Sequence, residues 1–393
     1  MKSEWKTIRA ADFMEFNPRR NLKKGTIATK ISMDKLQPYT KKIPETEQAE
    51  FSGGTKFSNG DTIMARITPC LENGKTAFID CLNKDEVAFG STEFIVLRAK
   101  PGVSDAQFVY YLATSPEFRQ VAIKSMVGSS GRQRVQQPVL ENLELVVPEL
   151  PEQKRIGEFL AAIDDKIALN AKINDNLQRQ AQVIYHERFE TVSPNALPSD
   201  WHIVTLGEVA TISNKSFNPL KEPEILLEHY SIPAFDEAKF PVFELSTSIK
   251  SNKFILDTSC FMISKLNPAT KRVWKPYCLT GNAVCSTEFI VYKAKNKSIT
   301  NFLYSVIDSS SFSDFMCSHV TGSTGSRQRT TPLDTLSYEL VLPSEDALAE
   351  FLSLVSPMYA QIRNNAIEND NLKRLRDSLL PKLMSGEIDV SAV

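Results

Sequence analysis

Ser91-Thr92-Glu93-Phe94-Ile95-Val96 occurs twice in this chain of 393 residues, the second time as Ser286-Thr287-Glu288-Phe289-Ile290-Val291. The same shift of 195 residues relates Arg132-Gln133-Arg134 to Arg327-Gln328-Arg329, and Asn170-Ala171-Lys172-Ile173-Asn174 to Asn365-Ala366-Ile367-Glu368-Asn369. Chance similarity does not keep one register over three separated blocks, and a long repeat indicates duplicated structure. We therefore predict a tandem duplication, each half being a mixed domain followed by a helix.

The mixed domains are predicted at residues 1–150 and 195–343. Short runs rich in β-branched and aromatic residues are typical of strands, and they fall at 62–67, 92–97, 261–266 and 288–292. Helices are expected at 105–125 and 299–317, between the repeated strand and a Gly/Ser loop in each half.

Two long helices are predicted at residues 151–194 and 344–393. In the first, apolar residues follow Pro151 at the alternating three-four spacing of a coiled coil: Ile156, Leu160, Ile163, Ile167, Leu177, Ala181 and Ile184. A helix of about 35 residues spans roughly 50 Å, so an antiparallel pair can hold two domains apart. The predicted fold class is α+β: two mixed α/β domains joined by two long antiparallel coiled-coil helices, with an internal pseudo-two-fold duplication.

Asparagines interrupt both apolar stripes in the middle of the helices. In an antiparallel pair, Asn170 and Asn174 would meet Asn369 and Asn365, and such a polar layer fixes register at a cost in stability. Replacing all four by Leu or Ile is expected to raise thermal stability and to loosen the distance between the domains.

The composition excludes several classes of protein. Apolar residues make up 42 % and charged residues 24 %, which is typical of a globular protein. No apolar run reaches the roughly 18 residues of a membrane span, and residues 1–5 lack the layout of a signal peptide, so we expect a cytoplasmic protein without a membrane partner. The six cysteines form no CxxC pair and the four histidines no HxxxH pair. We therefore predict neither a disulfide nor a metal site.

No catalytic motif is visible. Gly74-Lys75-Thr76 has Pro69 where a phosphate-binding loop needs glycine. The Asn/Asp-Pro-Pro-Tyr/Phe loop of an adenine methyltransferase is absent, and so is a G-x-S-x-G nucleophile turn. We predict no catalytic residue, and hence a protein that is not an enzyme.

The net charge of −1 requires any nucleic-acid contact to be local. Residues 118–140 and 258–287 carry basic residues and no acid. In the major groove, Arg can clamp guanine and Gln can pair with adenine, while Arg also binds phosphate. One Arg-Gln-Arg loop alone is more simply a solvated polar loop, but its repetition in both halves favours DNA. The predicted DNA-binding residues are Arg66, Lys75, Arg132, Gln133, Arg134, Lys265, Lys271, Arg272, Arg327, Gln328 and Arg329.

Several stretches resemble the specificity subunit of type I restriction-modification systems. Residues 60–75, GDTIMARITPCLENGK, and the repeated STEFIV and GSSGRQR blocks resemble its target recognition domains. Pro151-Glu152-Gln153-Lys154-Arg155-Ile156 resembles the start of its central conserved helix, and residues 379–388, LLPKLMSGEI, resemble its carboxy-terminal ending. The resemblance covers most of the chain.

The resemblance implies recognition of double-stranded DNA within a complex of two adenine-N6 methyltransferase subunits and two ATP-dependent restriction subunits. Each recognition domain would read one half of a bipartite asymmetric site, and the helix pair would set the spacer. S-adenosylmethionine, ATP and Mg would belong to the partner subunits, with no cofactor in this chain.

Two departures from the family pattern bear on function. Residues 266–275, LNPATKRVWK, replace the ITPCLENGK stretch in the second half, so the two half-sites should differ. The second helix starts with Pro343-Ser344-Glu345-Asp346-Ala347-Leu348 in place of PEQKRI, which bears on whether both methyltransferase-docking surfaces are equivalent. Two alternatives remain open: a scaffold that presents two similar domains to protein partners, and an enzyme with a dispersed active site.

Overall fold

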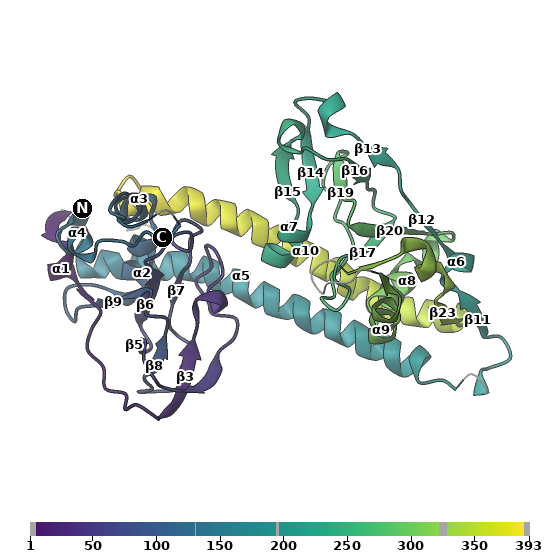
Figure 1. Cartoon of the computed structure of the whole chain (residues 1–393), viewed down its shortest axis with the longest axis horizontal. Helices are drawn as coiled ribbons and strands as arrows, with labels where there is room; N and C mark the ends of the chain where they lie inside the picture. The colour runs from purple at the N-terminus through teal and green to yellow at the C-terminus, as the bar shows by residue number, and fades with distance from the viewer. Residues whose placement is uncertain (1–4, 130, 194–195, 322–327, 389–393) are drawn as a thin grey trace. The chain divides into compact units, whose positions relative to one another are not determined.

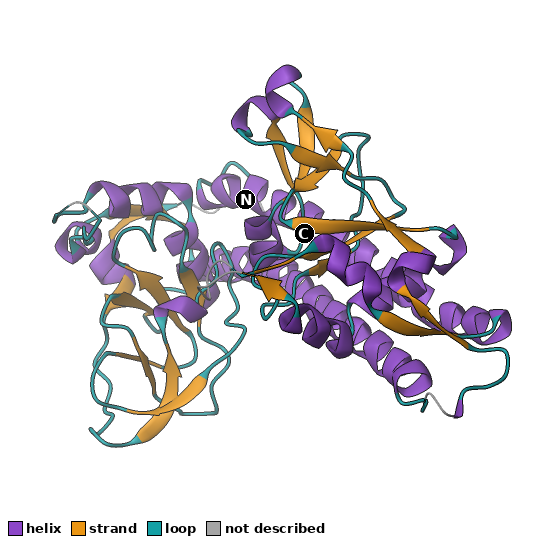
Figure 2. Cartoon of the chain, turned by 45° about the vertical axis from the view of Figure 1, so that its right-hand side comes forward, coloured by secondary structure: helices purple, strands orange, loops and turns teal. Residues whose placement is uncertain are grey.

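The computed structural model describes residues 5–129, 131–193, 196–321 and 328–388 (Figure 1). The chain divides into two compact units, which we call unit 1, Met1–Leu169 with Asn369–Val393, and unit 2, Asn170–Glu368. Each unit combines strands, short helices and parts of both long helices (Figure 2). The predicted α+β class is confirmed.

In the described part of unit 1, the strands form two four-stranded sheets and one two-stranded sheet. The first sheet has the order β2 (Met14–Phe16), β9 (Phe94–Ala99), β6 (Asp61–Ala65) and β7 (Thr76–Phe78). The second has the order β4 (Glu47–Glu50), β3 (Ile27–Ile31), β8 (Ala88–Gly90) and β5 (Thr55–Phe57), with β3 and β8 parallel. The third pairs β1 (Lys6–Arg9) with β10 (Glu144–Val147).

Unit 2 repeats the first of these sheets with the same order, as expected of a duplication. Its strands are β12 (Ala210–Ile212), β20 (Phe289–Ala294), β17 (Cys260–Ser264) and β18 (Val273–Trp274). A further sheet has the order β13 (Ser216–Phe217), β16 (Lys253–Ile255), β19 (Ala283–Ser286), β14 (Leu226–Tyr230) and β15 (Val242–Leu245). Two antiparallel pairs join β11 (His202–Thr205) to β23 (Glu339–Leu342), and β21 (Val320–Thr321) to β22 (Arg329–Thr330).

The repeated STEFIV stretch supplies a turn and then a central strand in each unit. Its last three residues begin β9 and β20, which are buried because their Phe, Ile and Val side chains are apolar. Val96 faces Ile63 of β6, and Val291 faces Met262 of β17. The preceding Ser-Thr-Glu turn is closed in both units by a serine hydroxyl, which accepts from Glu93 N at 3.1 Å and from Glu288 N at 3.2 Å. This turn fixes the backbone position of Glu93 and Glu288, and therefore the point from which each carboxylate side chain projects.

Each predicted short helix is in fact two helices. Residues 105–125 form α2 (Ala106–Thr114) and α3 (Pro116–Lys124), because the Ser115 side chain caps the new helix at Phe118 N and Pro116 has no N–H to continue the old one. Residues 299–317 likewise form α8 (Thr300–Ile307) and α9 (Ser310–Ser318), where the Ser309 side chain accepts from Phe312 N. The remaining α-helices among the described residues, the long pair apart, are short: α1 (Ala10–Phe13), α4 (Gln137–Glu141), α6 (Leu206–Val209) and α7 (Ile232–Ala238).

The long helices are α5 (Leu150–Tyr185) and α10 (Glu345–Met384), and parts of both pack against α2 or α8. In unit 1, Phe108 and Tyr111 of α2 share one buried cluster with Ile156 of α5 and Leu380 of α10. In unit 2, Phe302 of α8 lies in another cluster, where its ring centroid is 6.0 Å from those of both Tyr185 and Phe351. Because α2 also contacts β9 and β6, and α8 contacts β20 and β17, one buried helix in each unit connects the sheet that contains β9 or β20 to the long helices.

The helix segments within each unit are antiparallel. In unit 1, Asp164 of α5 pairs with Arg376 of α10, and Asn369 Nδ2 donates to Ile167 O at 3.1 Å. In unit 2, Asn170 Nδ2 donates to Glu368 Oε2 at 2.8 Å, and Asn365 Nδ2 donates to Asn174 Oδ1 at 2.8 Å. The four asparagines thus bond either to each other or to the opposite helix.

Replacing Asn174 alone by leucine is expected to lower the free energy of unfolding by about 1–3 kcal/mol, because the buried Asn365 amide loses its acceptor. Replacing both Asn174 and Asn365 by leucine removes donor and acceptor together, and is expected to be neutral or stabilising. Urea titrations of the single and double variants measure both effects. A double variant less stable than Asn174→Leu would contradict this account.

Candidate nucleic-acid interface

The Arg-Gln-Arg segment of unit 1 lies along the residues that follow β6. Thr68 N donates to Gln133 O at 3.0 Å, and Val135 N donates to Arg66 O at 2.8 Å. Arg66 N in turn donates to Glu93 O at 2.9 Å, which brings the Ser-Thr-Glu turn to the same place. Three segments distant in sequence therefore form one backbone framework, which we call the cradle.

Unit 2 builds the same cradle with different residues. Asn267 N donates to Gln328 O at 2.9 Å, Thr330 N to Lys265 O at 3.1 Å, and Lys265 N to Glu288 O at 2.9 Å. Since these bonds use backbone atoms, the framework survives the replacement of Arg66 and Thr68 by Lys265 and Asn267.

The last arginine of each Arg-Gln-Arg segment is held by the repeated glutamate. Arg134 Nε and Nη2 donate to Glu93 Oε1 at 3.0 and 2.6 Å. Arg329 Nε and Nη2 donate to Glu288 Oε2 and Oε1, both at 3.0 Å. These hydrogen bonds raise the pKa of both guanidinium groups, which stay charged. The side chains of Arg134 and Arg329 remain 43 % and 42 % exposed, so both pairs lie at the surface.

In unit 1, no carboxylate among the described residues holds the first arginine of the segment in this way. Arg132 is exposed, and its backbone N donates to Ser129 O at 3.0 Å. Gln133 and Gln328 are half-buried, and Gln133 N also donates to the Thr68 hydroxyl at 3.0 Å. Arg327, also predicted to bind DNA, lies outside the described residues.

Other predicted DNA-binding cations contact the protein itself. Arg66 Nη2 donates to Val135 O at 3.2 Å, and Lys75 Nζ donates to Met33 O at 3.0 Å.

In unit 2, Arg272 Nε and Nη2 donate to Asp236 at 2.6 and 2.9 Å. Lys271 pairs with Asp308 at 3.0 Å, and burial raises the pKa of the Asp308 carboxyl while Lys271 opposes that shift. Lys265 is half-buried. Residues 258–287 are thus acid-free in sequence but receive two carboxylates from distant segments.

A basic segment that is not among the predicted DNA-binding residues precedes β3 in unit 1. Arg19, Arg20, Lys23 and Lys24 occur within six residues without an acid, and that charge run was the available signal. All but the half-buried Arg20 are exposed. The segment is tied to α4, the helix that follows the Arg-Gln-Arg loop, because Asn17 Nδ2 donates to Gln137 Oε1 at 2.7 Å.

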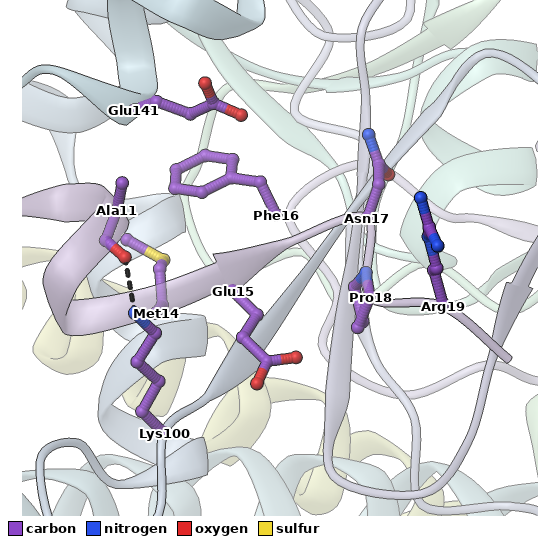
Figure 3. A pocket seen from close by; sticks show the side chains of 9 residues that line it. All are labelled: Ala11, Met14, Glu15, Phe16, Asn17, Pro18, Arg19, Lys100 and Glu141. Atoms are coloured by element: carbon purple, nitrogen blue, oxygen red, sulfur yellow. Dashed lines mark hydrogen bonds between the residues drawn. The ribbon is translucent and has the colours of Figure 1, made fainter.

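A shallow hollow of about 370 Å³ lies beside residues 14–19, where the basic segment begins (Figure 3). It is lined by Ala11, Met14, Glu15, Phe16, Asn17, Pro18, Arg19, Lys100 and Glu141. Lys100 Nζ donates to Ala11 O at 2.6 Å and is therefore turned to the backbone. Carboxylates and cations mix along its wall, so its charge selects neither an anion nor a cation.

Neither a metal-binding cluster nor a membrane-spanning helix occurs in the parts of the chain that the structure describes. Those residues include no group of three or more His, Cys, Asp or Glu side chains placed to hold a metal ion. No described helix is both long and apolar enough to cross a membrane.

Comparison with known proteins gives one consistent family. Residues 2–179 match the model of the type I restriction modification DNA specificity domain. The type I restriction enzyme HindI specificity subunit of Haemophilus influenzae is 23 % identical over 409 aligned residues, covering 84 % of this chain and 87 % of that protein. The EcoAI specificity subunit of Escherichia coli is 38 % identical over 104 residues, covering 26 % of this chain and only 18 % of that protein.

A solved structure shares the fold. The S subunit of a type I restriction-modification system from M. genitalium superposes with a TM-score of 0.55 at 17 % identity, over 97 % of this chain and 96 % of that one. At this identity the likeness concerns architecture, which agrees with the duplicated sheets described above.

Proposed function

Because this chain belongs to the DNA specificity subunits of type I restriction-modification systems, we propose that it is the non-catalytic, DNA-reading member of such a complex. Each half contacts one half-site of a bipartite, asymmetric DNA target. The observation that carries the proposal is the cradle, which occurs in both units with the same backbone bonds and the same arginine–glutamate pair. Arginine at a surface loop suits both phosphates and base edges.

The proposal assigns a role to each part of the chain. Residues 1–150 and 195–343 are the two target recognition domains, and the segments 151–194 and 344–393, to which α5 and α10 belong, are the spacers. The partners are double-stranded DNA, two adenine-N6 methyltransferase subunits and two restriction subunits. S-adenosylmethionine, ATP and Mg act in those subunits, and none is assigned to this chain.

The starts of the two spacer helices differ in what they bury. Gln153 is buried and donates to Pro148 O at 2.9 Å and to Val103 O at 3.2 Å, so this part of the PEQKRI motif holds unit 1 together. Leu348, 195 residues later, instead packs in the apolar cluster of unit 2. Lys154 and Arg155 remain exposed for a partner. This difference supports methyltransferase-docking surfaces of unequal strength.

Co-expression with its methyltransferase in a methylation-free host, followed by mapping of N6-methyladenine across the genome, tests the function. A bipartite motif with one modified adenine in each half is the expected result. An assembled complex that neither methylates nor binds DNA would overturn the proposal and favour a protein-binding scaffold.

Replacing Arg132 and Arg134 together by alanine is expected to weaken modification that depends on the first half-site, because both cations belong to the cradle of unit 1. The sequence preference at the second half-site should remain unchanged, since unit 2 has its own cradle. Methylation mapping of the variant complex measures both halves at once. Equal loss of preference at both halves, in a complex that still assembles, would show that the assignment of one half-site to each domain is wrong.

A further inference from the structure

The Arg-Gln-Arg segment is identical in the two halves, which limits what it can read. Unit 1 and unit 2 repeat its backbone bonds, and in both the final arginine is fixed by the same glutamate. The described pairs Gln133-Arg134 and Gln328-Arg329 thus place the same side chains on the same framework, and such an element prefers the same DNA feature in both places. It therefore cannot choose between two different half-site sequences, whereas it can bind the sugar-phosphate backbone that every sequence presents.

The loop that follows β6 in unit 1 differs from its counterpart and lies beside the cradle. It folds back on itself, since Leu71 N donates to Ile67 O at 3.1 Å and Lys75 N to Cys70 O at 3.1 Å. Arg119 of α3 braces it by donating through Nη2 to Leu71 O and Glu72 O at 3.1 and 3.2 Å. Glu72 and Asn73 are exposed at its tip.

The corresponding loop after β17 in unit 2 is built from other contacts. Thr270 N donates to Asn267 O at 2.8 Å in a tight turn, and the ion pairs of Lys271 with Asp308 and of Arg272 with Asp236 fasten the loop on both sides. Its exposed tip carries Ala269 and Thr270. Both tips emerge where β6 or β17 meets the cradle, but they present different chemical groups.

We propose a division of labour within each recognition domain, resting on the proposed function: Arg132-Gln133-Arg134 of unit 1 and Gln328-Arg329 of unit 2 anchor the DNA backbone, and the tips at 72–73 and 269–270 choose bases. Glu72 can accept from cytosine N4, and Asn73 can pair with adenine N6 and N7. Thr270 offers a hydroxyl for a base edge and a methyl group for thymine. The braces on each loop fix the backbone from which these side chains project, and such preorganisation lowers the cost of ordering the loop on DNA.

The test measures binding of the methyltransferase complex to a panel of DNA duplexes in which each base pair of both half-sites is changed in turn. Arg132→Ala is expected to weaken binding on the order of tenfold on every duplex, to lower the slope of log affinity against log salt by about 1, and to leave the order of preference unchanged. Glu72→Ala with Asn73→Ala is expected to reduce discrimination by about five- to a hundredfold at one or two base pairs of the first half-site only.

Thr270→Ala is the matched variant in unit 2, and it should relax the second half-site only. All these side chains are exposed, so thermal melting of each variant should match that of the unaltered complex. An altered base preference in Arg132→Ala, or an unchanged preference in the Glu72–Asn73 variant, would overturn the division of labour. An unaltered complex that binds all duplexes equally would instead remove the proposed function itself, so the two failures are distinguishable.

Discussion

Replacing Asp164 by alanine is expected to lower the free energy of unfolding of unit 1 by about 3–5 kcal/mol, because it leaves a buried cation without its main partner. The Asp164 side chain is only 5 % exposed and that of Arg376 is 10 % exposed. Arg376 Nη1 donates to Asp164 Oδ1 at 2.6 Å, and the Tyr111 hydroxyl donates to Asp164 Oδ2 at 2.6 Å. Without the carboxylate, the exposed Asp377, at 2.8 Å, would be the remaining side-chain partner of Arg376 within the described part of the chain.

Lys41 adds to this expected loss. It is buried over the rings of Phe78, Tyr110 and Tyr111, with Nζ 5.4–5.9 Å from their centroids. Burial lowers the pKa of Lys41, and the negative charge of Asp164 opposes that shift. Removing Asp164 therefore makes the charged form of Lys41 more costly as well.

Hydrogen exchange of peptides from α2 and from residues 150–169 of α5, measured by mass spectrometry along a urea series, reports the stability of unit 1 separately from that of unit 2. Asp164→Leu with Arg376→Met should be close to neutral or stabilising, because it removes both charges. Tyr359 lies 195 residues after Asp164 and occupies the matching position in unit 2. Its hydroxyl shares a hydrogen bond of 2.8 Å with the Ser305 hydroxyl, and neither group is charged. Ser305→Ala should therefore lower the free energy of unfolding by only about 1 kcal/mol. An Asp164→Ala cost as small as that of Ser305→Ala would show that the charges are not the cause.

Sequence comparison was sufficient for the parts of the fold that depend on local or repeated patterns. The STEFIV repeat predicts β9 and β20, whose apolar side chains need a buried sheet position. The three-four stripe likewise predicts α5 and α10. The division of residues 105–125 was also encoded locally, since Ser115-Pro116 is a cap followed by a residue without an N–H. Its apolar spacing alone had indicated one helix.

The parts that sequence could not supply depend on partners far away in the chain. β4 reads Glu-Gln-Ala-Glu and becomes a strand only because it pairs with β3. Lys271 and Arg272 lie in a stretch without acidic residues, so the sequence predicts that their charges are unpaired. In the structure they contact Asp308 and Asp236, which are 37 and 36 residues away in the sequence. The arginine–glutamate pairs of the cradle span 41 residues in both units. Local charge counts cannot detect such neutralisation, whereas the repeat did identify the loop itself.

Replacing Arg134 by alanine is expected to weaken DNA binding through the first domain more than replacing Arg132, on the order of a hundredfold against tenfold at low salt. Arg134→Ala is expected to have the larger effect because it leaves the partner of Arg134, the Glu93 carboxylate, in place. The Glu93 side chain is 25 % exposed, and its carboxylate is neutralised by the Arg134 guanidinium at 2.6 Å. Without that guanidinium, a negative charge remains on the surface proposed to face phosphates, and its repulsion adds to the lost contact.

The double variant Glu93→Ala with Arg134→Ala should therefore bind DNA better than Arg134→Ala alone and should approach the affinity of Arg132→Ala. Raising the salt concentration should reduce the difference between the single and double variants, because salt screens exposed charges. Fluorescence anisotropy of labelled duplexes at several salt concentrations measures these affinities, and Glu288→Ala with Arg329→Ala provides the matched comparison in unit 2. If Glu93→Ala weakens binding as much as Arg134→Ala, and the double variant is no better, the pair contributes only the shape of the loop.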